Sequence, residues 1–393
     1  MTHTELTVYG AAWCTDCRRA KKFLGEQRVH YRWVDIEQDP TGQEFVERIN
    51  DGKRIIPTII FDDGSHLVEP SNAELAAKLG LQTRASMSYY DLIIVGGGPA
   101  GLTTALYAAR EGLETLVIEQ SGLGGQAGVT ERLDNFPGFP DGVGGGEFGD
   151  RLAQQARRFG VELLQAQAVT GLREEGESRY ITTADGADYG ARAVLIATGS
   201  RYLRLGVEGE ADLIGAGVHY CATCDGPFYK GQPVAVIGGG NSAAEEGIFL
   251  TRFASEVTML VRGAALTASK LVIDKVNENT KMTVRYNTEV VALRGDGHLS
   301  GVTIRDRATG ATEEIHPAGV FVFIGLSPNT TWLPVEVRRN AAGFVVTSPT
   351  LETSMPGVFA AGDVREGSTK QAASAAGEGA TAALAIREYL KQM

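Results

Sequence analysis

An apolar run that leads into closely spaced glycines, DLIIVGGGPAG, is the feature that most constrains the fold of this chain. Residues 91–95 predict a buried strand, Gly96, Gly98 and Gly101 predict a tight turn, and TTALYAAR predicts a helix after it. The glycines let a pyrophosphate approach the helix N-terminus, and Glu119, ending the next strand, is placed to bond a ribose hydroxyl. The sequence predicts a parallel α/β unit that binds an adenine dinucleotide. A glycine-rich turn that binds nothing is the alternative.

The same pattern of strand, turn and helix occurs again in VAVIGGGNSAAEE, with Gly238, Gly240 and Ala243 at the turn. A chain with both units is expected to bind two nucleotides. The residue after the second strand of each unit discriminates between them, because an acid there holds a free ribose 2′-hydroxyl and a base accommodates a 2′-phosphate. The second unit has Arg262 at this position. It is therefore predicted to bind NADP(H).

All four cysteines fall into two C-x-x-C pairs, Cys14 with Cys17 and Cys221 with Cys224. Thiols at this spacing at the start of a helix can close a small disulfide, and the helix N-terminus favours the attacking thiolate. The pairs predict dithiol redox chemistry. A zinc site is the alternative, but its two halves normally lie about 15 to 20 residues apart, and here a nucleotide-binding pattern lies between them.

Composition and charge restrict the class of protein. A length of 393 residues predicts two or three domains, and no apolar run is long enough to span a bilayer. The N-terminus lacks the features of a signal peptide, so with paired redox cysteines we expect a soluble protein of the reducing cytoplasm. A net charge of −11 argues against nucleic acid or an anionic membrane as the main partner.

From Tyr89 to its end the chain resembles the low-molecular-weight, bacterial-type thioredoxin reductase flavoproteins. The motifs that carry the resemblance are GGGPAG, the GGQ of residues 124–126, DNFPGF, the ATG of residues 197–199, CATCDG, GGGNSA, and VFAAGDV followed by KQAASAAGEG. The resemblance implies an FAD domain interrupted by an inserted NADPH domain that also carries the dithiol. It implies FAD and NADPH as cofactors, no metal, and a homodimer.

The resemblance also assigns residues to the two cofactors. Asp363 is implied to bond the ribityl chain, and Gln371 and Ala372 to lie beside the isoalloxazine. The residues expected to contact FAD are Gly96, Gly98, Gly101, Glu119, Gly125, Gln126, Asn135, Thr198, Gly199, Gly362, Asp363, Gln371 and Ala372. Those expected to contact NADPH are Gly238, Gly240, Ser242, Ala243 and Arg262.

The expected 2′-phosphate clamp departs from the family pattern. The family commonly has a His-Arg-Arg run and a further Arg, whereas this chain reads VRGAALTASK, so that Arg262 remains and Gly263 and Thr267 replace two arginines. Ser242, or Ser269 and Lys270, would compensate in part. NADPH is still favoured over NADH because no acid stands at the discriminating position.

Within CATCDG the resemblance assigns Cys221 to exchange with the disulfide substrate and Cys224 to the flavin. Asp225 resembles the acid that exchanges protons with these thiols, with a plain Asp-Gly turn as the alternative. His219 lies two residues before the pair. We expect a structural role for it, because the family motif requires no base there.

The first 82 residues resemble a glutaredoxin or mycoredoxin-like thioredoxin fold, on the strength of a C-x-x-C after a strand and a Pro that opens a later strand. Cys14, at the helix start, is predicted as the nucleophile, and Cys17 as the thiol that resolves the mixed disulfide. The resemblance implies a cis bond before Pro57. Thr15 and Asp16 between the cysteines differ from common glutaredoxins, so specificity for glutathione or mycothiol is not carried over.

The sequence therefore predicts an α/β chain with a thioredoxin-fold domain followed by two Rossmann-like domains. The expected divisions are 1–82 for the glutaredoxin-like domain, 83–88 for a linker, 89–204 and 326–393 for the FAD domain, and 205–325 for the NAD(P)H domain, with hinges near Arg204 and Ser327. Electrons are predicted to pass from NADPH to FAD, to Cys221/Cys224, to Cys14/Cys17 and on to an external disulfide. A peroxiredoxin-dedicated reductase, a dithiol oxidase and a redox-sensing interaction protein are alternatives.

Overall fold

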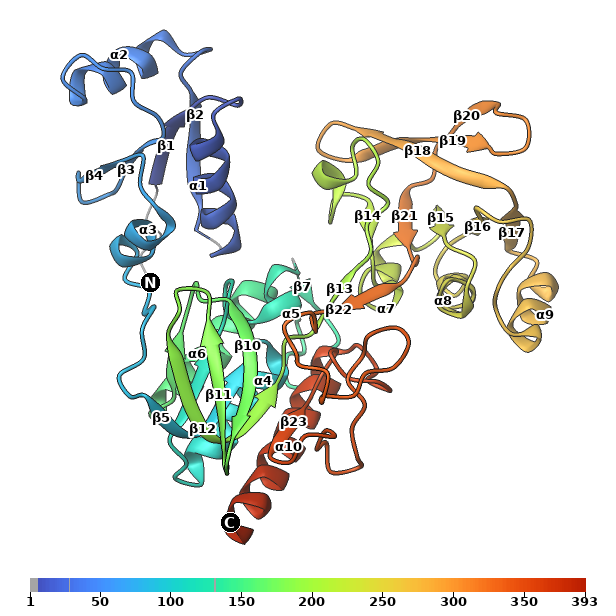
Figure 1. The fold of residues 1–393 in the computed structure, drawn as a ribbon. Coiled ribbons are helices and arrows are strands. Elements are labelled where there is room, and N and C mark those ends of the chain that lie inside the picture. The colour runs from blue at the N-terminus through green and yellow to red at the C-terminus, as the bar shows by residue number, and fades with distance from the viewer. Residues whose placement is uncertain (1–5, 28, 131) are drawn as a thin grey trace.

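The computed structural model describes residues 6–27, 29–130 and 132–393, and the side chains of Thr223 and Cys224 lie outside this description. The elements form three groups, each built around a sheet (Figure 1). The first group is the arm (β1 to α3). The second is the central domain (β5 to β13 together with β22 to α10), and the third is the inserted domain (η1 to β21), which interrupts the central domain in sequence.

The arm is a four-stranded sheet of order β2-β1-β3-β4, with β1 parallel to β2 and antiparallel to β3. Its elements are β1 (Leu6–Gly10), α1 (Thr15–Glu26), β2 (Tyr31–Asp35), α2 (Pro40–Ile49), β3 (Thr58–Ile60), β4 (His66–Val68) and α3 (Asn72–Lys78). Asp39 caps α2, and Ser71 forms a capping box with Glu74 at α3. The strand, redox turn and helix predicted for this segment are confirmed.

The central domain contains the first nucleotide-binding pattern. Its strands form a sheet of order β10-β11-β12-β5-β6-β9, and β23 returns from the end of the chain to pair with β12. Its elements are β5 (Tyr89–Val95), α4 (Pro99–Arg110), β6 (Thr115–Ile118), α5 (Gly125–Val129), β7 (Arg132–Leu133), β8 (Val143–Gly144), α6 (Gly145–Arg158), β9 (Glu162–Leu164), β10 (Val169–Glu175), β11 (Ser178–Thr183), β12 (Asp188–Ile196), β13 (Ser200–Tyr202), β22 (Leu326–Pro328), β23 (Val358–Ala360) and α10 (Ala372–Gln392).

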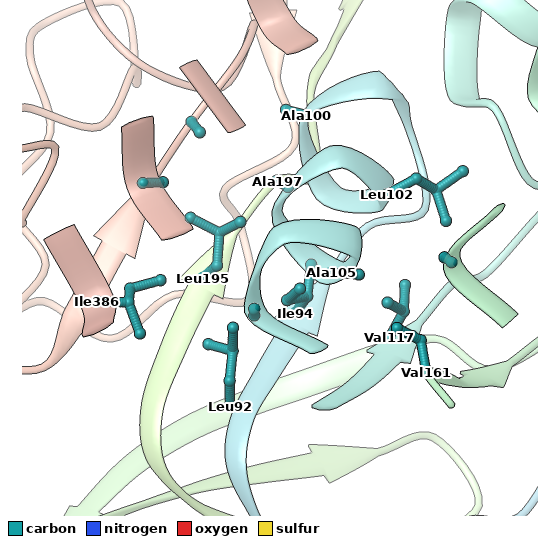
Figure 2. Close-up of a cluster of buried hydrophobic side chains, with 14 of the residues drawn as sticks. Leu92, Ile94, Ala100, Leu102, Ala105, Val117, Val161, Leu195, Ala197 and Ile386 are labelled. Carbon is teal, nitrogen blue, oxygen red and sulfur yellow. The ribbon is translucent and has the colours of Figure 1, made fainter. Parts of the chain in front are cut away.

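A buried cluster between the central sheet and its helices joins the two halves of this domain. Figure 2 shows Leu92 and Ile94 on β5 facing Ala105 on α4 and Ile386 on α10. A Cβ on Gly379 would lie 2.3 Å from the carbonyl oxygen of Ala100, so α10 packs on α4 backbone against backbone. The last helix of the chain is thereby fixed beside the first glycine turn.

The inserted domain contains the second nucleotide-binding pattern, on a parallel sheet of order β14-β21-β15-β16-β17. An antiparallel sheet of β18, β19 and β20 covers it. Its elements are η1 (Ala211–Leu213), β14 (Val218–His219), α7 (Ala222–Asp225), η2 (Gly226–Tyr229), β15 (Pro233–Ile237), α8 (Asn241–Leu250), β16 (Glu256–Leu260), α9 (Lys270–Glu278), β17 (Met282–Arg285), β18 (Thr288–Gly295), β19 (Leu299–Asp306), β20 (Thr312–Ile315) and β21 (Gly319–Val322). Among the described residues, no helix has the length and apolar character that crossing a bilayer requires.

Two short antiparallel strands, β13 and β22, connect the central and inserted domains, with Tyr202 opposite Leu326. The segment that follows β13 is held by the buried carboxylate of Glu210, which accepts hydrogen bonds from the backbone N–H groups of Leu205 and Gly206, each at 2.8 Å. The same carboxylate accepts the Tyr220 hydroxyl at 2.7 Å. The connection is therefore tied to the residue that precedes Cys221.

The predicted linker is bound to the central domain. The Glu162 carboxylate on β9 accepts hydrogen bonds from the backbone N–H of Ser86 at 2.6 Å and from its hydroxyl at 2.8 Å. At the C-terminal end of α1, the Glu26 carbonyl oxygen accepts the N–H of Gly122 at 2.7 Å, and Ala166 packs against the hydrophobic cluster of the arm. The arm is thus docked on the central domain, which the linker composition did not predict.

We predict that Glu162→Ala loosens the arm. The substitution removes the acceptor for Ser86 and for the Tyr90 hydroxyl, which lies 2.5 Å from the carboxylate, and hydrogen bonds to a charged group are each worth about 1.5–3 kcal/mol. Limited proteolysis followed by mass spectrometry should show cleavage within residues 83–88 about tenfold faster than in the wild type. Glu256→Ala, an exposed position on β16, is the matched control. Equal cleavage rates in both variants would contradict the tether.

Candidate redox and nucleotide site

The arm thiols lie at the N-terminus of α1. Cys14 is the N-cap residue, and its sulfur accepts the backbone N–H of Cys17 at 3.1 Å. The Cys14 thiol donates to the carbonyl oxygen of Ile56, 3.8 Å away, and the predicted cis bond between Ile56 and Pro57 is confirmed. The helix dipole and the capping N–H suit a negative charge on the Cys14 sulfur.

Cys17 is fully buried one turn further into α1. Burial, together with the hydrogen bond to Cys14, raises the pKa of the Cys17 thiol to about 12. A Cβ on Gly10 would lie 2.7 Å from its sulfur and equally close to the Trp33 ring, so glycine makes the space for this thiol. Trp13, next to Cys14, is 63% exposed and offers an apolar surface at the site. We therefore expect Cys14, rather than Cys17, to react with external disulfides.

The glycines of the first turn let backbone approach backbone. Gly96 has φ of 112°, and a Cβ there would lie 2.3 Å from the carbonyl oxygen of Ala197. A Cβ on Gly101 would lie 1.9 Å from the carbonyl oxygen of Gly96. Gly98 caps α4 without a side chain, and a Cβ on Gly125 would lie 3.1 Å from the Gly98 Cα. The helix N-terminus therefore ends in a cradle made of backbone, which fits a pyrophosphate.

Glu119 follows β6 at the rim of this cradle and is 9% exposed. One carboxylate oxygen accepts the N–H of Gly97 at 2.6 Å, and the other accepts the N–H of Ser121 at 2.7 Å. The acid is thus fixed beside the glycine turn, at the position where a dinucleotide ribose would lie.

A segment near the C-terminus of the chain also borders the N-terminus of α4. Gly362 has φ of 78°, and a Cβ there would lie 3.0 Å from the Ala100 Cβ. Asp363 follows it. Burial raises the pKa of the Asp363 carboxyl, and the Ser368 hydroxyl lies 3.4 Å from it. Asp363 is half-buried, and the charges of Lys370 and Glu378 also act on its carboxylate. Its acceptor oxygens suit a ligand that brings hydroxyl groups.

Two motifs that lie far apart in sequence meet here. Asn135 donates to the Gln371 side-chain oxygen at 3.1 Å, and residues 134–140 line a cavity of about 480 Å³. The Thr198 hydroxyl donates to the Asn329 carbonyl oxygen at 2.8 Å. The other residues predicted for FAD lie at the start of α5 (Gln126), in the turn after β12 (Gly199) and at the start of α10 (Ala372).

The second turn repeats the construction of the first. Gly238 has φ of 140°, and a Cβ there would lie 2.4 Å from the carbonyl oxygen of Phe323 and 2.8 Å from the Ala243 Cβ. Gly240 caps α8 without a side chain, and Ser242 is exposed in the first turn of that helix. The N-terminus of α8 is therefore open to a second phosphate group.

Arg262 is exposed two residues after the end of β16. Its carbonyl oxygen accepts Nη1 of Arg307 at 3.1 Å. Sequence reasoning missed Arg307, because it follows β19, in a different sheet and outside any motif. The loop that carries Arg262 is fixed to the turn by the N–H of Thr267, which donates to the Gly239 carbonyl oxygen at 2.7 Å.

The second dithiol segment begins directly after β14. Cys221 is disulfide-bonded, whereas Cys14 and Cys17 are free thiols. The backbone of Cys224 belongs to α7, but its predicted role falls on a side chain outside the described ones. The two cysteine pairs lie in different domains (Figure 1), which does not suit one shared zinc site.

Asp225 ends α7, and its backbone N–H donates to the Cys221 carbonyl oxygen at 3.1 Å. His219 Nδ1 lies 3.4 Å from the Asp225 carboxylate, a contact that the sequence motif did not indicate. Burial and the charges of Asp363, Glu246 and Asp225 raise the pKa of Tyr202 to about 12. Acids of both domains therefore contribute to the raised pKa of Tyr202 on β13.

Comparison with known proteins gives matches over both parts of the chain. The model of the family described as pyridine nucleotide-disulphide oxidoreductase matches residues 90–379. The glutaredoxin family model matches residues 6–67. The two matches together span the arm, the central domain and the inserted domain.

Individual relatives agree with the family models. A thioredoxin reductase of Treponema pallidum is 41% identical over 301 residues, which are 77% of this chain and 97% of the relative. A bifunctional thioredoxin reductase/thioredoxin of Mycobacterium leprae is 41% identical over 309 residues, 78% of this chain and 67% of that protein. The crystal structure of a thioredoxin reductase from Streptococcus pyogenes has a TM-score of 0.74 and 38% identity, and covers 78% of this chain and 100% of that chain.

We predict that the arm thiols differ sharply in reactivity. A thiol with a pKa of about 12 is ionised only as the pH approaches that value, so near pH 8 the thiolate of Cys17 amounts to on the order of one part in ten thousand. Iodoacetamide should modify Cys14 at least about tenfold faster than Cys17, as measured by peptide mass spectrometry. In denaturant the two rates should become equal. Similar labelling of both thiols in the folded protein would contradict the assignment of Cys14 as the accessible nucleophile.

Proposed function

Because this chain belongs to the pyridine nucleotide-disulphide oxidoreductase family, we propose that it is a flavoprotein in which two dithiols act in series. The family relationship makes it an NADPH-dependent disulfide oxidoreductase of the thioredoxin reductase type. The observation that carries the proposed series is the pair of redox segments on separate domains. One contains the disulfide-bonded Cys221 and the other the free thiol of Cys14 at a helix start.

FAD is the proposed cofactor of the central domain. Gly96, Gly98 and Gly101 would hold its pyrophosphate at the N-terminus of α4, and Glu119 would bind its ribose. Asp363 would bind the ribityl hydroxyls. When bound, a flavin accepts a hydride from a nicotinamide and passes two electrons to a disulfide.

NADPH is the proposed cofactor of the inserted domain. Gly238, Gly240 and Ala243 would hold its pyrophosphate at the N-terminus of α8, and Arg262 would bind the 2′-phosphate. The Arg307 guanidinium holds the backbone of this loop, because its Nη1 donates to the Arg262 carbonyl oxygen, and its Nε lies 3.6 Å from the Glu289 carboxylate. Arg262 supports NADPH over NADH, although it is the one arginine of the family clamp that the sequence retains.

The proposed exchange runs from the Cys221 sulfur to the arm. A Cys221 thiolate attacks the Cys14 sulfur of an oxidised arm, the bond between Cys14 and Cys17 breaks, and the released Cys17 takes up a proton. The high pKa of Cys17 favours that protonation. Cys224 then attacks the Cys221 sulfur, the bond between Cys221 and Cys14 breaks, and Cys14 leaves as a thiolate. Cys14 attacks an external disulfide, one sulfur of which leaves as a thiol, and Cys17 attacks Cys14 to release the other. Asp225 would hold and move the proton that these thiol steps exchange.

We also propose a cellular location, an oligomeric state and partners for this enzyme. We place the enzyme in the cytoplasm as a homodimer, with a disulfide substrate and with neither nucleic acid nor membrane as partner. The fused relative from Mycobacterium leprae, named for both a reductase and a thioredoxin, supports a reductase that carries its own disulfide-reducing domain. Fusion raises the effective concentration of the arm at its reductase.

A panel of acceptors identifies the substrate and tests the activity. Purified protein is supplied with NADPH and, in turn, glutathione disulfide, mycothiol disulfide, oxidised thioredoxin, and peroxiredoxin with peroxide. NADPH oxidation with one of the disulfides supports the proposal. Oxidation with oxygen alone indicates a dithiol oxidase, dependence on peroxiredoxin indicates a dedicated peroxide reductase, and no oxidation with any acceptor indicates a redox sensor.

We predict that Cys14→Ser uncouples the relay. NADPH should still open the disulfide of Cys221, as measured by thiol labelling, because Cys14 lies on another domain. Turnover with the accepted disulfide should fall by about a hundredfold or more, since the external nucleophile is lost.

Two further variants complete this test. Cys221→Ser should leave the arm without a reductant, whereas Cys17→Ser should trap the acceptor on Cys14 as a mixed disulfide that a small thiol releases. A non-reducing gel detects the trapped species. If Cys14→Ser keeps full activity on every acceptor, the arm is a docking module and the series is wrong.

We predict that Arg262→Ala discriminates between the two nicotinamide cofactors. Loss of a charged hydrogen bond of about 1.5–3 kcal/mol should raise the KM for NADPH by about 10- to 100-fold and leave the KM for NADH within about threefold. Steady-state kinetics with each cofactor measure this. Arg294→Ala, an exposed arginine paired with Glu208 at 2.9 Å, is the control. Equal losses for both cofactors would remove Arg262 from the 2′-phosphate site.

A further inference from the structure

A line of three polar side chains leads away from the dithiol segment into the inserted domain. The Asp225 carboxylate lies 3.4 Å from His219 Nδ1. The other ring nitrogen of His219, Nε2, lies 2.6 Å from the Tyr229 hydroxyl. His219 precedes the C-x-x-C pair in sequence, and Tyr229 follows it. The fold brings Asp225, His219 and Tyr229 together in that order.

The histidine ring is fixed by its surroundings. His219 is 7% exposed, and pairing of β14 with β21 sets it opposite Phe321, with ring centroids 5.3 Å apart. The Tyr229 ring stands edge-on to both rings, at 5.3 Å from His219 and 5.5 Å from Phe321. Glycine at position 319 leaves room for Tyr229, because a Cβ there would lie 2.5 Å from its ring.

The partners determine which nitrogen carries the proton. Nδ1 of His219 faces the Asp225 carboxylate at 3.4 Å, and an N–H on this nitrogen makes the contact favourable, because an ionised carboxylate only accepts hydrogen bonds. Nε2 then accepts from the Tyr229 hydroxyl. Burial, and next the charge of Asp225, raises the pKa of Tyr229 to about 12, so this hydroxyl keeps its proton at neutral pH and remains a donor.

We propose that His219 is a positioning residue for Asp225: its ring, held between Tyr229 and Phe321, fixes the carboxylate at the end of α7, next in sequence to the dithiol with which it exchanges a proton. This inference rests on the proposed role of Asp225 in thiol exchange. In the overall reaction NADPH supplies a hydride, equal to two electrons and one proton, and solvent supplies a second proton, so that one disulfide becomes two thiols. One of the two protons passes through Asp225 on its way to a sulfur.

Other charged groups also act near this acid. The Tyr202 hydroxyl on β13 lies within the field of Asp225, Glu246 on α8 and Asp363 on the central domain. Burial raises the pKa of the Glu246 carboxyl. His219 and Tyr229, by contrast, form the line of contacts that leads to Asp225, so their substitution should affect the acid most directly.

Two substitutions of His219 separate the hydrogen bond from the packing. His219→Phe keeps an aromatic ring between Tyr229 and Phe321 and removes the donor. His219→Asn keeps an N–H near the position of Nδ1 and removes the ring. If His219 acts through its donor, His219→Asn should retain the wild-type pH profile more closely than His219→Phe. If it acts through packing, the order should be reversed.

The measurement is turnover of the full-length holoenzyme with NADPH and a small aromatic disulfide, from about pH 5 to about pH 10. Asp225→Asn should abolish the limb of the profile on which activity falls as pH rises. His219→Phe removes the polar group that faces the charged carboxylate, so this limb should move to higher pH by about one unit. Tyr229→Phe should move it in the same direction by less.

The double variant His219→Phe/Asp225→Asn shows whether His219 acts through the acid. We expect its activity to equal that of Asp225→Asn alone, within about twofold. His316→Asn, at an exposed histidine directly after β20, controls for loss of an imidazole. If Asp225→Asn abolishes this limb but His219→Phe does not move it, the inference about His219 is wrong and the proposed role of Asp225 stands. A profile unchanged by Asp225→Asn overturns both the inference and the proposed role of the acid.

Discussion

Contact of backbone with backbone at the first glycine turn is the constraint on which the nucleotide site depends. No side chain fits at Gly101, where a Cβ would lie 1.9 Å from the Gly96 oxygen, or at Gly379, where it would lie 2.3 Å from the Ala100 oxygen. The first contact sets α4 against β5, and the second sets α10 against α4. Segments from both ends of the central domain therefore meet at the open N-terminus of α4, and Glu119 and Asp363 become parts of one site.

The strands that attach the inserted domain contact the residue before Cys221, so a movement of this domain would affect the dithiol segment. Its connections are β13 and β22, and Glu210 ties the chain after β13 to Tyr220. Tyr220 stacks on Tyr202 with ring centroids 5.4 Å apart and is followed by Cys221. The proposed flavin would have to meet the dithiol and the nicotinamide in turn, so a rotation about these strands would act directly on the segment that carries Cys221.

Local motifs predicted most of the fold. They also selected the candidate site residues, whose roles remain predictions. Strand, glycine turn and helix are encoded within a few consecutive residues, so both nucleotide-binding turns, the redox helix of the arm and the cis bond before Pro57 were predictable. The contacts of Arg307 with Arg262 and of Ser86 with Glu162 were not. Each joins residues that are distant in sequence, and neither side of the contact has a composition that signals the other. His219 was visible next to the cysteines, but its contact with Asp225 depends on how β14 leads into α7.

The way the arm is attached bears on how electrons can leave the molecule. Docking uses the C-terminal end of α1, and α1 is 12 residues long, so the N-terminal thiol is held about 18 Å from the docking point. The attachment includes hydrogen bonds at Glu162 and Gly122, each worth about 0.5–3 kcal/mol, and the packing of Ala166 against the arm. Cys14 is 6% exposed and lies next to the exposed Trp13, at the end of α1 away from these contacts. Exchange with Cys221 would therefore require the arm to leave this docked position, or a second copy of the chain to bring its own dithiol to Cys14.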